Sequence, residues 1–320
     1  MRSVEETIIE QIRKAAEGVA SSEVRLGIGD DTAVLRAPRE GREILLTTDQ
    51  VIENTHFVRH KHPARALGHK TLARGLSDVA AMGGEPLCFL LSLCLPEWAR
   101  GSWLRQYIYG MFQVAKREKA PCAGGDIARG ECFCAALTVV GTVARGKALR
   151  RDGARPGDLL FVSGRLGGSE LGLSGLLSEA SGRSAAVRRH LFPEPRLALG
   201  RLLSGLRASA AIDLSDGLSM DLARLARSSR VGAEIDAAAV PVFPGASLEQ
   251  ALHGGEEYEL LFAVRPAARV PASAGGVRLS CIGRVRKELG VVLRTAHGVE
   301  NLEPRGYQHF SGDRNGSRGE

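Results

Sequence analysis

Aspartate recurs in this chain at the predicted junctions between strands and helices rather than on exposed helix faces. Carboxylate and hydroxyl oxygens are the ligands that hard divalent cations prefer, and magnesium commonly bridges such acids to substrate phosphates. No conspicuous cluster of histidine or cysteine competes with them, so oxygen-only ligation favours magnesium over zinc. The candidate ligands are Asp31, Thr47, Thr48, Asp49, Asp78, Asp126, Asp213 and Asp216.

Two neighbouring acids follow a glycine turn near the start of the chain. The stretch GIGDDTAVL, residues 27–35, places Asp30 and Asp31 side by side. Adjacent carboxylates repel each other, so the pair is either a solvated turn or has a cation against one member. The first alternative has general support, because aspartate in turns bonds to nearby backbone.

Asp78 is the acid that local structure explains least well. It lies in a predicted helix that ends about one turn later, where the helix dipole is negative and aspartate is a poor helix former. Either Arg74, one turn earlier, or a bound divalent ion would remove the conflict. Asp213 and Asp216 flank Ser215 where another helix is predicted to begin. Helix capping by Ser215 or Asp216 explains that stretch equally well.

The common nucleotide-binding signatures are missing. The sequence has no G-x-x-x-x-G-K-[ST] loop, and Thr32 stands where the dinucleotide fingerprint requires its third glycine. Protein-kinase signatures are missing as well. Glycine-rich turns, which let backbone amides approach an anion, are nevertheless frequent. They contain Gly27 and Gly29, Gly83–Gly84, Gly124–Gly125, Gly167–Gly168 and Gly254–Gly255.

Hydrophobic spacing predicts the elements that must position these residues. Helices are expected up to about residue 17, over residues 63–82 and 102–119, and from about Ser215. Strands are expected over residues 24–26, 32–36, 43–48, 88–95, 132–144, 159–164, 258–264 and 281–285. In this interpretation Asp49 ends a strand, and Asp126 follows a glycine pair before the next strand.

Length and composition indicate a globular protein of two domains. A chain of 320 residues exceeds the usual size of one hydrophobic core. Residues 150–158, RRDGARPGD, concentrate charge, glycine and proline between apolar strands, which is typical of a linker. We predict an α/β (α+β) protein with an N-terminal domain over residues 1–149, a C-terminal α/β domain over residues 150–310 and a disordered tail over residues 311–320.

Composition also argues against several classes of partner. The net charge of +7 permits an anionic ligand, but the basic residues are dispersed and aromatic residues make up only 5%, which disfavours a nucleic-acid platform. No apolar run approaches the roughly 20 residues needed to span a bilayer, and the N-terminus is an amphipathic helix rather than a signal peptide. A cytoplasmic protein is therefore expected. The six cysteines lack C-x-x-C spacing and are predicted to be reduced core residues.

Eight motifs occur in a fixed order from about Gly27 to Phe310. They are GIGDDTAVL, TTDQVIENTHF, LSDVAAMGGEP, GGDIARG, GARPGDLLFVSG, IDLSDGLSMDL, HGGEEYELLF and GYQHF. In this order and approximate spacing the chain resembles the thiamine-monophosphate kinase family across nearly its whole length. The wider superfamily includes aminoimidazole ribonucleotide synthetase and selenophosphate synthetase, and the second, seventh and eighth motifs favour the thiamine branch.

The resemblance implies an aminoimidazole ribonucleotide synthetase-like fold. Its N-terminal sheet would form a barrel with the sheet of a second copy in a homodimer, and its C-terminal domain would close the active site. It implies that ATP phosphorylates thiamine monophosphate to give thiamine diphosphate and ADP, with several magnesium ions. Since the acceptor is a largely anionic phosphate monoester, no strong general base is required, and charge neutralisation with in-line positioning should dominate.

Matched motif by motif, the eight candidate ligands correspond to the family's magnesium set. Asp31 then serves as a ligand, while Asp30 caps the turn or supports the site. The ATP contacts resemble Gly125, Asp126, Arg151 and Ser215. The catalytic set would be Asp49, Asp126, Arg151 and Asp216. The thiamine-phosphate contacts resemble His56, Glu256 and Tyr307.

Local alternatives remain for the three substrate residues. His56 would otherwise be a structural histidine, Glu256 a turn cap and Tyr307 a loose aromatic near the C-terminus. The chain also departs from the family pattern at His253, Glu257 and Gln308, the last of which leaves the shape of the substrate cap open. Two other functions compete: another ATP-dependent synthetase of the superfamily, and a nucleotide-binding scaffold that keeps the acids for structure.

Overall fold

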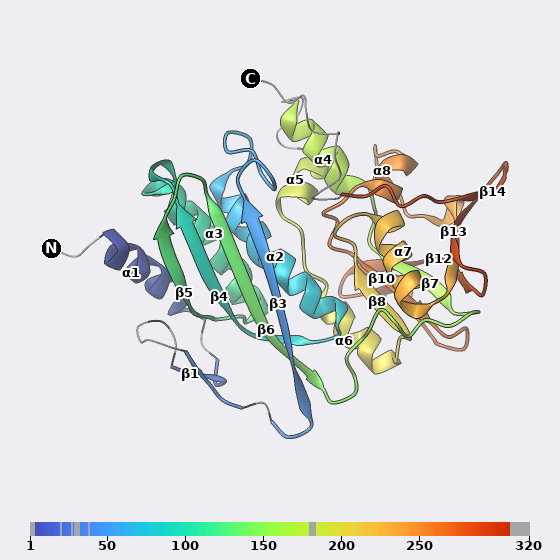
Figure 1. Cartoon of the computed structure of the whole chain (residues 1–320), viewed down its shortest axis with the longest axis horizontal. Helices are drawn as coiled ribbons and strands as arrows, with labels where there is room; N and C mark the ends of the chain where they lie inside the picture. The colour runs from blue at the N-terminus through green and yellow to red at the C-terminus, as the bar shows by residue number, and fades with distance from the viewer. Residues whose placement is uncertain are drawn as a thin grey trace.

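The computed structural model describes residues 4–19, 21–26, 28, 33–37, 39–178 and 184–307, without the side chains of residues 4–6. It contains two main sheets, one formed before and one after the predicted linker (Figure 1). The first has the strand order β3 (Arg42–Ile52), β6 (Cys134–Ala144), β4 (Glu85–Leu95) and β5 (Cys122–Arg129). All neighbours are antiparallel except β4 and β5. A short ribbon of β1 (Val24–Leu26) and β2 (Val34–Leu35) precedes this sheet.

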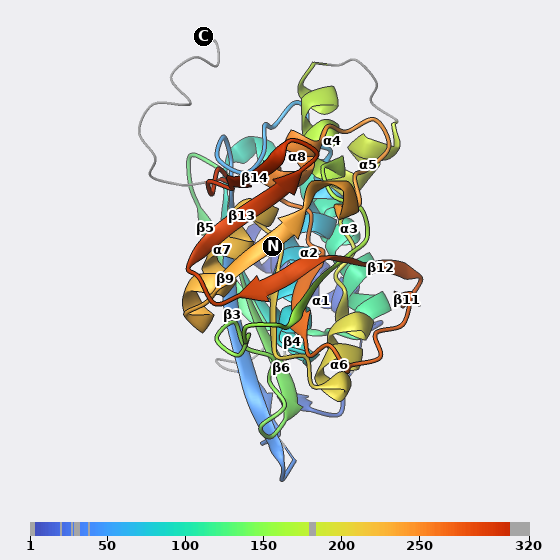
Figure 2. The same cartoon turned by 90° about the vertical axis from the view of Figure 1, so that its right-hand side faces the viewer.

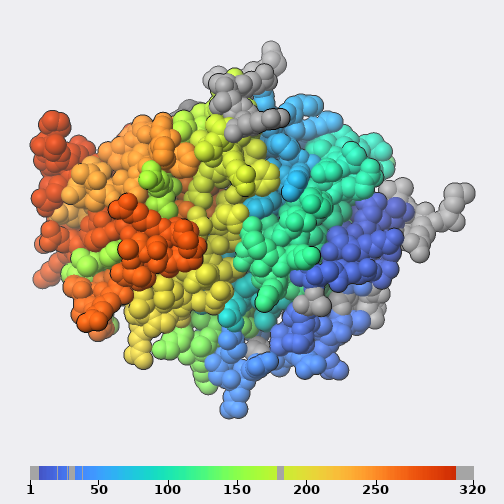
Figure 3. Space-filling view, turned by 180° about the vertical axis from the view of Figure 1, so that it is seen from behind, coloured from blue at the N-terminus to red at the C-terminus, as the bar shows by residue number. Residues whose placement is uncertain are grey.

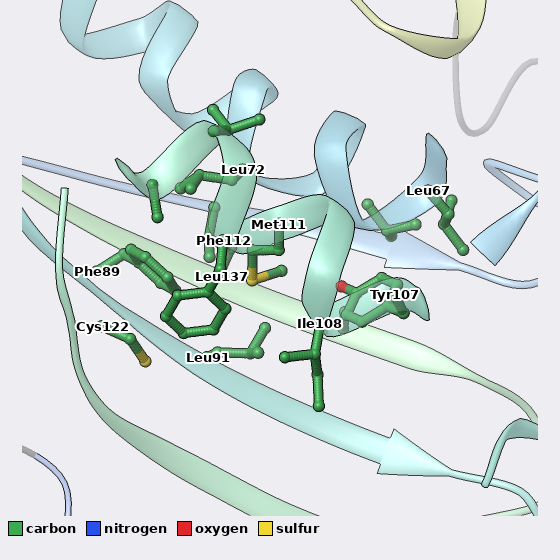
Figure 4. Close-up of a cluster of buried hydrophobic side chains, with 14 of the residues drawn as sticks. Leu67, Leu72, Phe89, Leu91, Tyr107, Ile108, Met111, Phe112, Cys122 and Leu137 are labelled. Atoms are coloured by element: carbon green, nitrogen blue, oxygen red, sulfur yellow. The ribbon is translucent and has the colours of Figure 1, made fainter. Parts of the chain in front are cut away.

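Helices cover one face of the first sheet. The helices α2 (Ala64–Ala81) and α3 (Ser102–Glu118) pack on it, and α1 (Val4–Ala16) packs against α3. Figure 4 shows the resulting core, in which Leu72, Met111 and Phe112 meet Leu137 of β6. A Cβ atom added at Gly68 would lie 1.9 Å from the carbonyl oxygen of Tyr107. The absence of a side chain there allows α2 to approach α3 closely.

The other face of the first sheet carries exposed apolar residues. Side chains alternate along a strand, so Ile44 and Leu46 of β3 point away from the helices. They are 51% and 71% exposed, and Leu90 of β4 is 37% exposed. We call this side the outer face of the sheet.

The second sheet has the strand order β14 (Gly298–Asn301), β13 (Gly290–Thr295), β9 (Gly232–Asp236), β12 (Val277–Arg286), β7 (Leu159–Ser163), β10 (Leu260–Val264) and β8 (Ala210–Asp213). An eighth strand, β11 (Ser273–Ala274), pairs with β12. The neighbouring strands β9 and β13 run parallel to each other. Figure 2 shows β12, β9 and β13 side by side. The accompanying helices are α4 (Gly168–Leu177), α5 (Ala185–Leu191), α6 (Leu197–Leu206), α7 (Leu218–Ser229) and α8 (Leu248–His253).

The two halves meet along α2. This helix packs on the edge strand β3 of the first sheet and also contacts β8, the edge strand of the second, and α6. Seen from behind, the two halves form one continuous surface (Figure 3). A Cβ atom at Gly200 of α6 would lie 2.0 Å from the carbonyl oxygen of Ala80, so a glycine is needed at this contact. Residues on α2 are therefore placed between two strand edges.

The predicted helices over residues 63–82 and 102–119 are confirmed by α2 and α3, but three junctions differ. Strand β3 continues beyond Asp49 to Ile52 because it pairs with β6 along its full length. Asp126 lies inside β5 rather than before a strand. The helix expected from Ser215 begins at Leu218, and its N-cap Gly217 has no side chain to cap with, so the capping explanation is wrong.

All six cysteines are free thiols, as predicted, but they are not all core residues. Cys88 and Cys122 are buried, whereas Cys132 and Cys281 are exposed, because they lie in a loop and on the exposed side of a strand. Within the described part of the chain, no helix is long and apolar enough to cross a membrane.

Candidate functional site

Three aspartates from separate elements converge beside α2, and we call Asp49, Asp78 and Asp213 the acid cluster. Thr47 and Asp49 alternate with Leu46 along β3 and therefore face α2. The Thr47 hydroxyl donates to Asp78 Oδ2 at 2.5 Å. From the next residue back on α2, the Ser77 hydroxyl donates to Asp213 Oδ2 at 2.8 Å. The two edge strands thus bring their acids to one helix.

The acid cluster holds more negative charge than its surroundings neutralise. Burial raises the pKa of Asp78, and the charge of Asp49 raises it further. Burial and the charge of Asp78 raise the pKa of Asp213 to about 7. Arg151 acts in the opposite direction on both groups but does not outweigh burial. A cation placed among these carboxylates would remove both penalties.

A cavity of about 650 Å³ opens beside the acid cluster. Asp78, Thr47 and Arg151 contribute its polar wall, and Leu45 and Met82 contribute part of its apolar wall. An apolar wall next to charged groups suits a ligand with an aromatic base and an anionic chain. Of the residues predicted to contact ATP, Arg151 therefore lines a suitable space.

The donor chemistry of the site fits magnesium. The cluster offers carboxylate oxygens and a threonine hydroxyl, which suit a hard cation. Among the residues that the structure describes, no three acidic, histidine or cysteine side chains form a ready-made metal cage. Magnesium commonly takes one or two protein carboxylates and completes its shell with water and substrate phosphates, so such a cage is not required.

Asp216 lies just beyond the cluster and is held by an arginine. The Arg224 guanidinium donates to Asp216 at 2.5 Å and to Asp221 at 2.8 Å. Asp221 also accepts a hydrogen bond from the Asp216 backbone N–H at 3.0 Å. Tyr307 approaches the same turn, since its backbone N–H donates to the Asp216 carbonyl at 3.2 Å. Asp216 and Tyr307 are thus neighbours in the fold, although they are far apart in sequence.

Glu256 lies in a strained segment that is tied to the same turn. Both Glu256 and Tyr258 have left-handed backbone conformations, with φ of 59° and 50°. Such conformations persist where the surroundings enforce them, often at functional sites. Here the Glu256 N–H donates to the carbonyl of Ser215 at 2.7 Å, and the Tyr258 N–H donates to that of Leu214 at 2.9 Å.

The Glu256 carboxylate is already paired inside the protein. Lys70 of α2, itself buried, donates to it at 2.7 Å. Burial would raise the pKa of Glu256, but Lys70 and other nearby cationic groups outweigh burial and lower it. Buried His190 lies 3.3 Å from the Lys70 ammonium and 3.4 Å from the His62 ring. Glu256 is 26% exposed, so one side of the pair remains open to a ligand.

Four predicted site residues lie away from the acid cluster. Asp126 and Gly125 are on β5, at the opposite edge of the sheet from β3. Asp126 stands beside Ser92 in the strand register and is exposed, and Thr48 accepts a hydrogen bond from Thr138 on the outer face. His56 follows β3 and accepts a hydrogen bond from the Ile52 N–H. The predictions for Asp31, Asp30 and Gln308 fall outside the described residues.

Two departures from the family pattern have structural roles. His253 ends α8, where its ring lies 2.7 Å from the Ser219 hydroxyl and 3.1 Å from the Arg305 guanidinium. Glu257 accepts hydrogen bonds from the backbone of Ser169 and from Arg189. Neither side chain displaces a predicted ligand.

Comparison with known proteins supports the resemblance over nearly the whole chain. Residues 29–143 match the AIR synthase related protein, N-terminal domain, and residues 155–295 match the corresponding C-terminal domain. Thiamine-monophosphate kinase of Escherichia coli K12 is 38% identical over 307 residues, covering 90% of this chain and 93% of the relative. The chain belongs to the thiamine-monophosphate kinase family.

Solved structures of this family share the fold. Thiamine-monophosphate kinase from Stenotrophomonas maltophilia K279a superposes with a TM-score of 0.81 at 35% identity, covering 89% of this chain and 95% of that one. AaThiL complexed with AMPPCP and TMP gives a TM-score of 0.78 at 34% identity, with 97% and 99% covered. The predicted two-domain aminoimidazole ribonucleotide synthetase-like fold is therefore confirmed.

Several side chains that border the candidate site had no role in the sequence predictions. They are Lys70, His190, Asp221 and Arg224. One signal was available, because Lys70, Arg74 and Asp78 recur every four residues and so lie on one face of α2. His190 had no such signal, since the two groups that it meets beside α2, His62 and Lys70, are more than 100 residues away in the sequence.

Proposed function

We propose that this protein transfers the terminal phosphate of ATP to thiamine monophosphate, giving thiamine diphosphate and ADP. The observation that carries this proposal is the under-neutralised acid cluster beside a cavity lined by Arg151, in a chain of the thiamine-monophosphate kinase family. The relative solved with AMPPCP and TMP supports it. Magnesium is the cation that we assign to the cluster.

The reaction needs no protein base. An oxygen of the acceptor phosphate attacks the γ-phosphorus of ATP, and the bond from that phosphorus to the β–γ bridging oxygen breaks. ADP leaves with the electron pair, and the total phosphate charge is the same before and after when the acceptor is a dianion. Bound magnesium would neutralise phosphate charge during transfer.

This chain's residues would hold the reactants in line. We assign Asp49, Asp78 and Asp213, with Thr47, to the cation end of the site. Arg151 would contact the ATP phosphates from the cavity wall. Asp216, now paired with Arg224, would join the ligand set when a cation competes for it.

At the other end of the site, Glu256 and Tyr307 would contact the thiamine moiety. The thiazolium ring is a permanent cation, for which a carboxylate and an aromatic face are suitable neighbours. Because Lys70 already pairs with Glu256, the carboxylate would be shared between the ammonium and the thiazolium. We retain His56 as a contact to the substrate phosphate.

We further propose a homodimer that forms through the outer face of the first sheet. The exposed Ile44, Leu46 and Leu90 give that face an apolar centre. Asp126 and Gly125 are remote from the acid cluster of their own chain, so we infer that they act at the cluster of the partner copy. Residues 1–149 would then form the dimerising, ATP-binding domain, and residues 150–310 would form the closing domain.

Hybrid dimers test this arrangement. Asp78→Asn and Asp126→Asn variants, each nearly inactive alone, should regain activity after they are mixed and allowed to exchange subunits. Half of the sites in a mixed dimer would then contain both native acids. No recovery in mixtures shown to exchange would place both acids in one chain's site.

The basic activity is tested by incubating the purified protein with ATP, magnesium and thiamine monophosphate. Equal amounts of thiamine diphosphate and ADP are expected by chromatography, and no product at high enzyme concentration would overturn the proposal. Parallel reactions with an aminoimidazole precursor or selenide test the synthetase alternative. We place this activity in the cytoplasm, where ATP and magnesium are supplied.

A further inference from the structure

Arg74 is a mostly buried arginine that forms one ion pair but leaves part of its guanidinium without a partner. It lies on α2 with its side chain only 15% exposed. Its Nε is the one buried side-chain nitrogen or oxygen of the described residues that lacks a hydrogen-bond partner. The nearest acid is Asp49, with 3.6 Å between Arg74 Nη2 and Asp49 Oδ1, which is longer than a hydrogen bond. A buried N–H without a partner lowers the stability of the fold, so we expect a bound ligand to supply the acceptor.

The position of Arg74 along the helix indicates what that acceptor is. Lys70 and Asp78 lie one helical turn to either side on the same face, each about 6 Å away along the axis. Lys70 holds Glu256 at the thiamine end of the proposed site, and Asp78 belongs to the cation end. Arg74 therefore lies between the group that would bind the thiazolium and the group that would bind the phosphates of ATP.

We propose that Arg74 binds the phosphate of the acceptor, thiamine monophosphate, through the Nε–Nη2 edge of its guanidinium. This inference rests on the proposed function and adds a phosphate-recognising residue to it. That edge of arginine matches two phosphate oxygens at once, and the resulting bonds are charge-assisted. Two oxygens held in this way leave the third free to attack.

The surroundings keep Arg74 charged for this role. Burial acts to lower its pKa, but Tyr258, Asp49 and other nearby acids outweigh burial and raise it. The alternative is a purely structural role, in which Arg74 only neutralises the charge of Asp49. The ion pair between Arg74 Nη2 and Asp49 Oδ1 at 3.6 Å already serves that role, but it does not use Nε, which is left without an acceptor.

The test compares the binding of thiamine monophosphate with that of thiamine, which lacks the phosphate. Calorimetry with magnesium and without ATP should show that Arg74→Met weakens thiamine monophosphate binding by about 10- to 100-fold, the usual range for charge-assisted bonds. Thiamine binding should change less than about twofold. Arg74→Lys, which keeps the charge but loses the fork, should recover only part of the selectivity.

The matched control is Arg65→Met, on the same helix, where the guanidinium lies 4.9 Å from the centre of the Tyr109 ring. It should bind both compounds like the unaltered protein. The proposal is overturned if Arg74→Met weakens both ligands equally, or only tightens magnesium binding. If Arg74→Met fails to fold, unchanged selectivity in Arg74→Lys overturns it. If the unaltered protein binds no thiamine monophosphate, the proposed function fails first, and the role of Arg74 falls with it.

Discussion

The buried carboxylate of Glu259 and the buried carboxylates of the acid cluster differ in how far nearby cations neutralise them. Glu259 of the second half accepts hydrogen bonds from Arg189 at 2.6 Å and from Arg196 at 2.8 Å. Burial would raise its pKa, but the two arginines outweigh burial and lower it. Asp213 in the acid cluster is buried to a similar degree, yet its pKa is raised to about 7.

The difference separates a carboxylate that the chain itself neutralises from a cluster that it leaves short of cations. The Glu259 network is complete within the chain and fixes α5 and the segment before α6 against the second sheet. The acid cluster instead borders a cavity and has too few cations of its own. Buried negative charge that lies beside a cavity and lacks cationic partners is what a cation-binding site requires before its ion binds.

The largest expected effect comes from breaking the complete network. Glu259→Gln leaves mostly buried Arg196 without its carboxylate and Arg189 with Glu257 alone, which should reduce the free energy of unfolding by about 3–5 kcal/mol. Urea unfolding followed by circular dichroism measures this. The exposed Glu249→Gln should change stability by less than about 0.5 kcal/mol. A loss as small as that in Glu259→Gln would mean that the network contributes little.

In the acid cluster, the same type of substitution should preserve stability and reduce activity. Asp213→Asn removes a repelling charge, so the metal-free protein should be as stable as before or more stable by about 1 kcal/mol. Formation of thiamine diphosphate should nevertheless fall by about 100-fold or more, since a ligand of the cation is lost. Full activity in a folded Asp213→Asn protein would show that the cluster does not serve the reaction.

The buried histidines add a third case to this comparison. Burial lowers their pKa values and keeps the rings neutral, so no ion pair is needed. Burial and then the charge of Lys70 lower the pKa of His62 to about 4. The unfolded chain, with a histidine pKa of about 6.5, binds this proton more readily, so stability falls as the pH drops below about 6.5. His62 alone should account for about 2 kcal/mol at pH 5.

Urea unfolding at pH 7.5 and pH 5.0 measures this contribution. His62→Gln should lose less stability between the two pH values than the unaltered protein, by about the amount given above. The exposed His60→Gln is the control and should follow the unaltered protein. Equal losses in all three proteins would exclude His62 as a source of acid sensitivity.

Hydrophobic spacing and residue propensities predicted the helices and strands, and also the unfavourable position of Asp78 near the C-terminus of its helix. Both depend only on spacing within one helix or strand. They failed at Asp126, where a glycine pair suggested a turn. Gly125 is needed instead because a Cβ there would lie 1.8 Å from the Leu91 carbonyl oxygen of the neighbouring strand. The partners of Glu259 and His190 were equally out of reach, since only the folded chain brings α5, α2 and β10 together. The family motifs supplied candidate site residues where spacing alone left the choice open.

Magnesium binding tests the central claim most directly. Calorimetric titration in the presence of AMPPCP, which resists hydrolysis, should show more than one magnesium ion per unaltered chain. Asp78→Asn should lose at least one of these ions or bind it at least about tenfold more weakly, while the exposed Asp236→Asn should match the unaltered protein. Equal numbers and affinities for a folded Asp78→Asn protein would contradict the assignment of the acid cluster as the cation site.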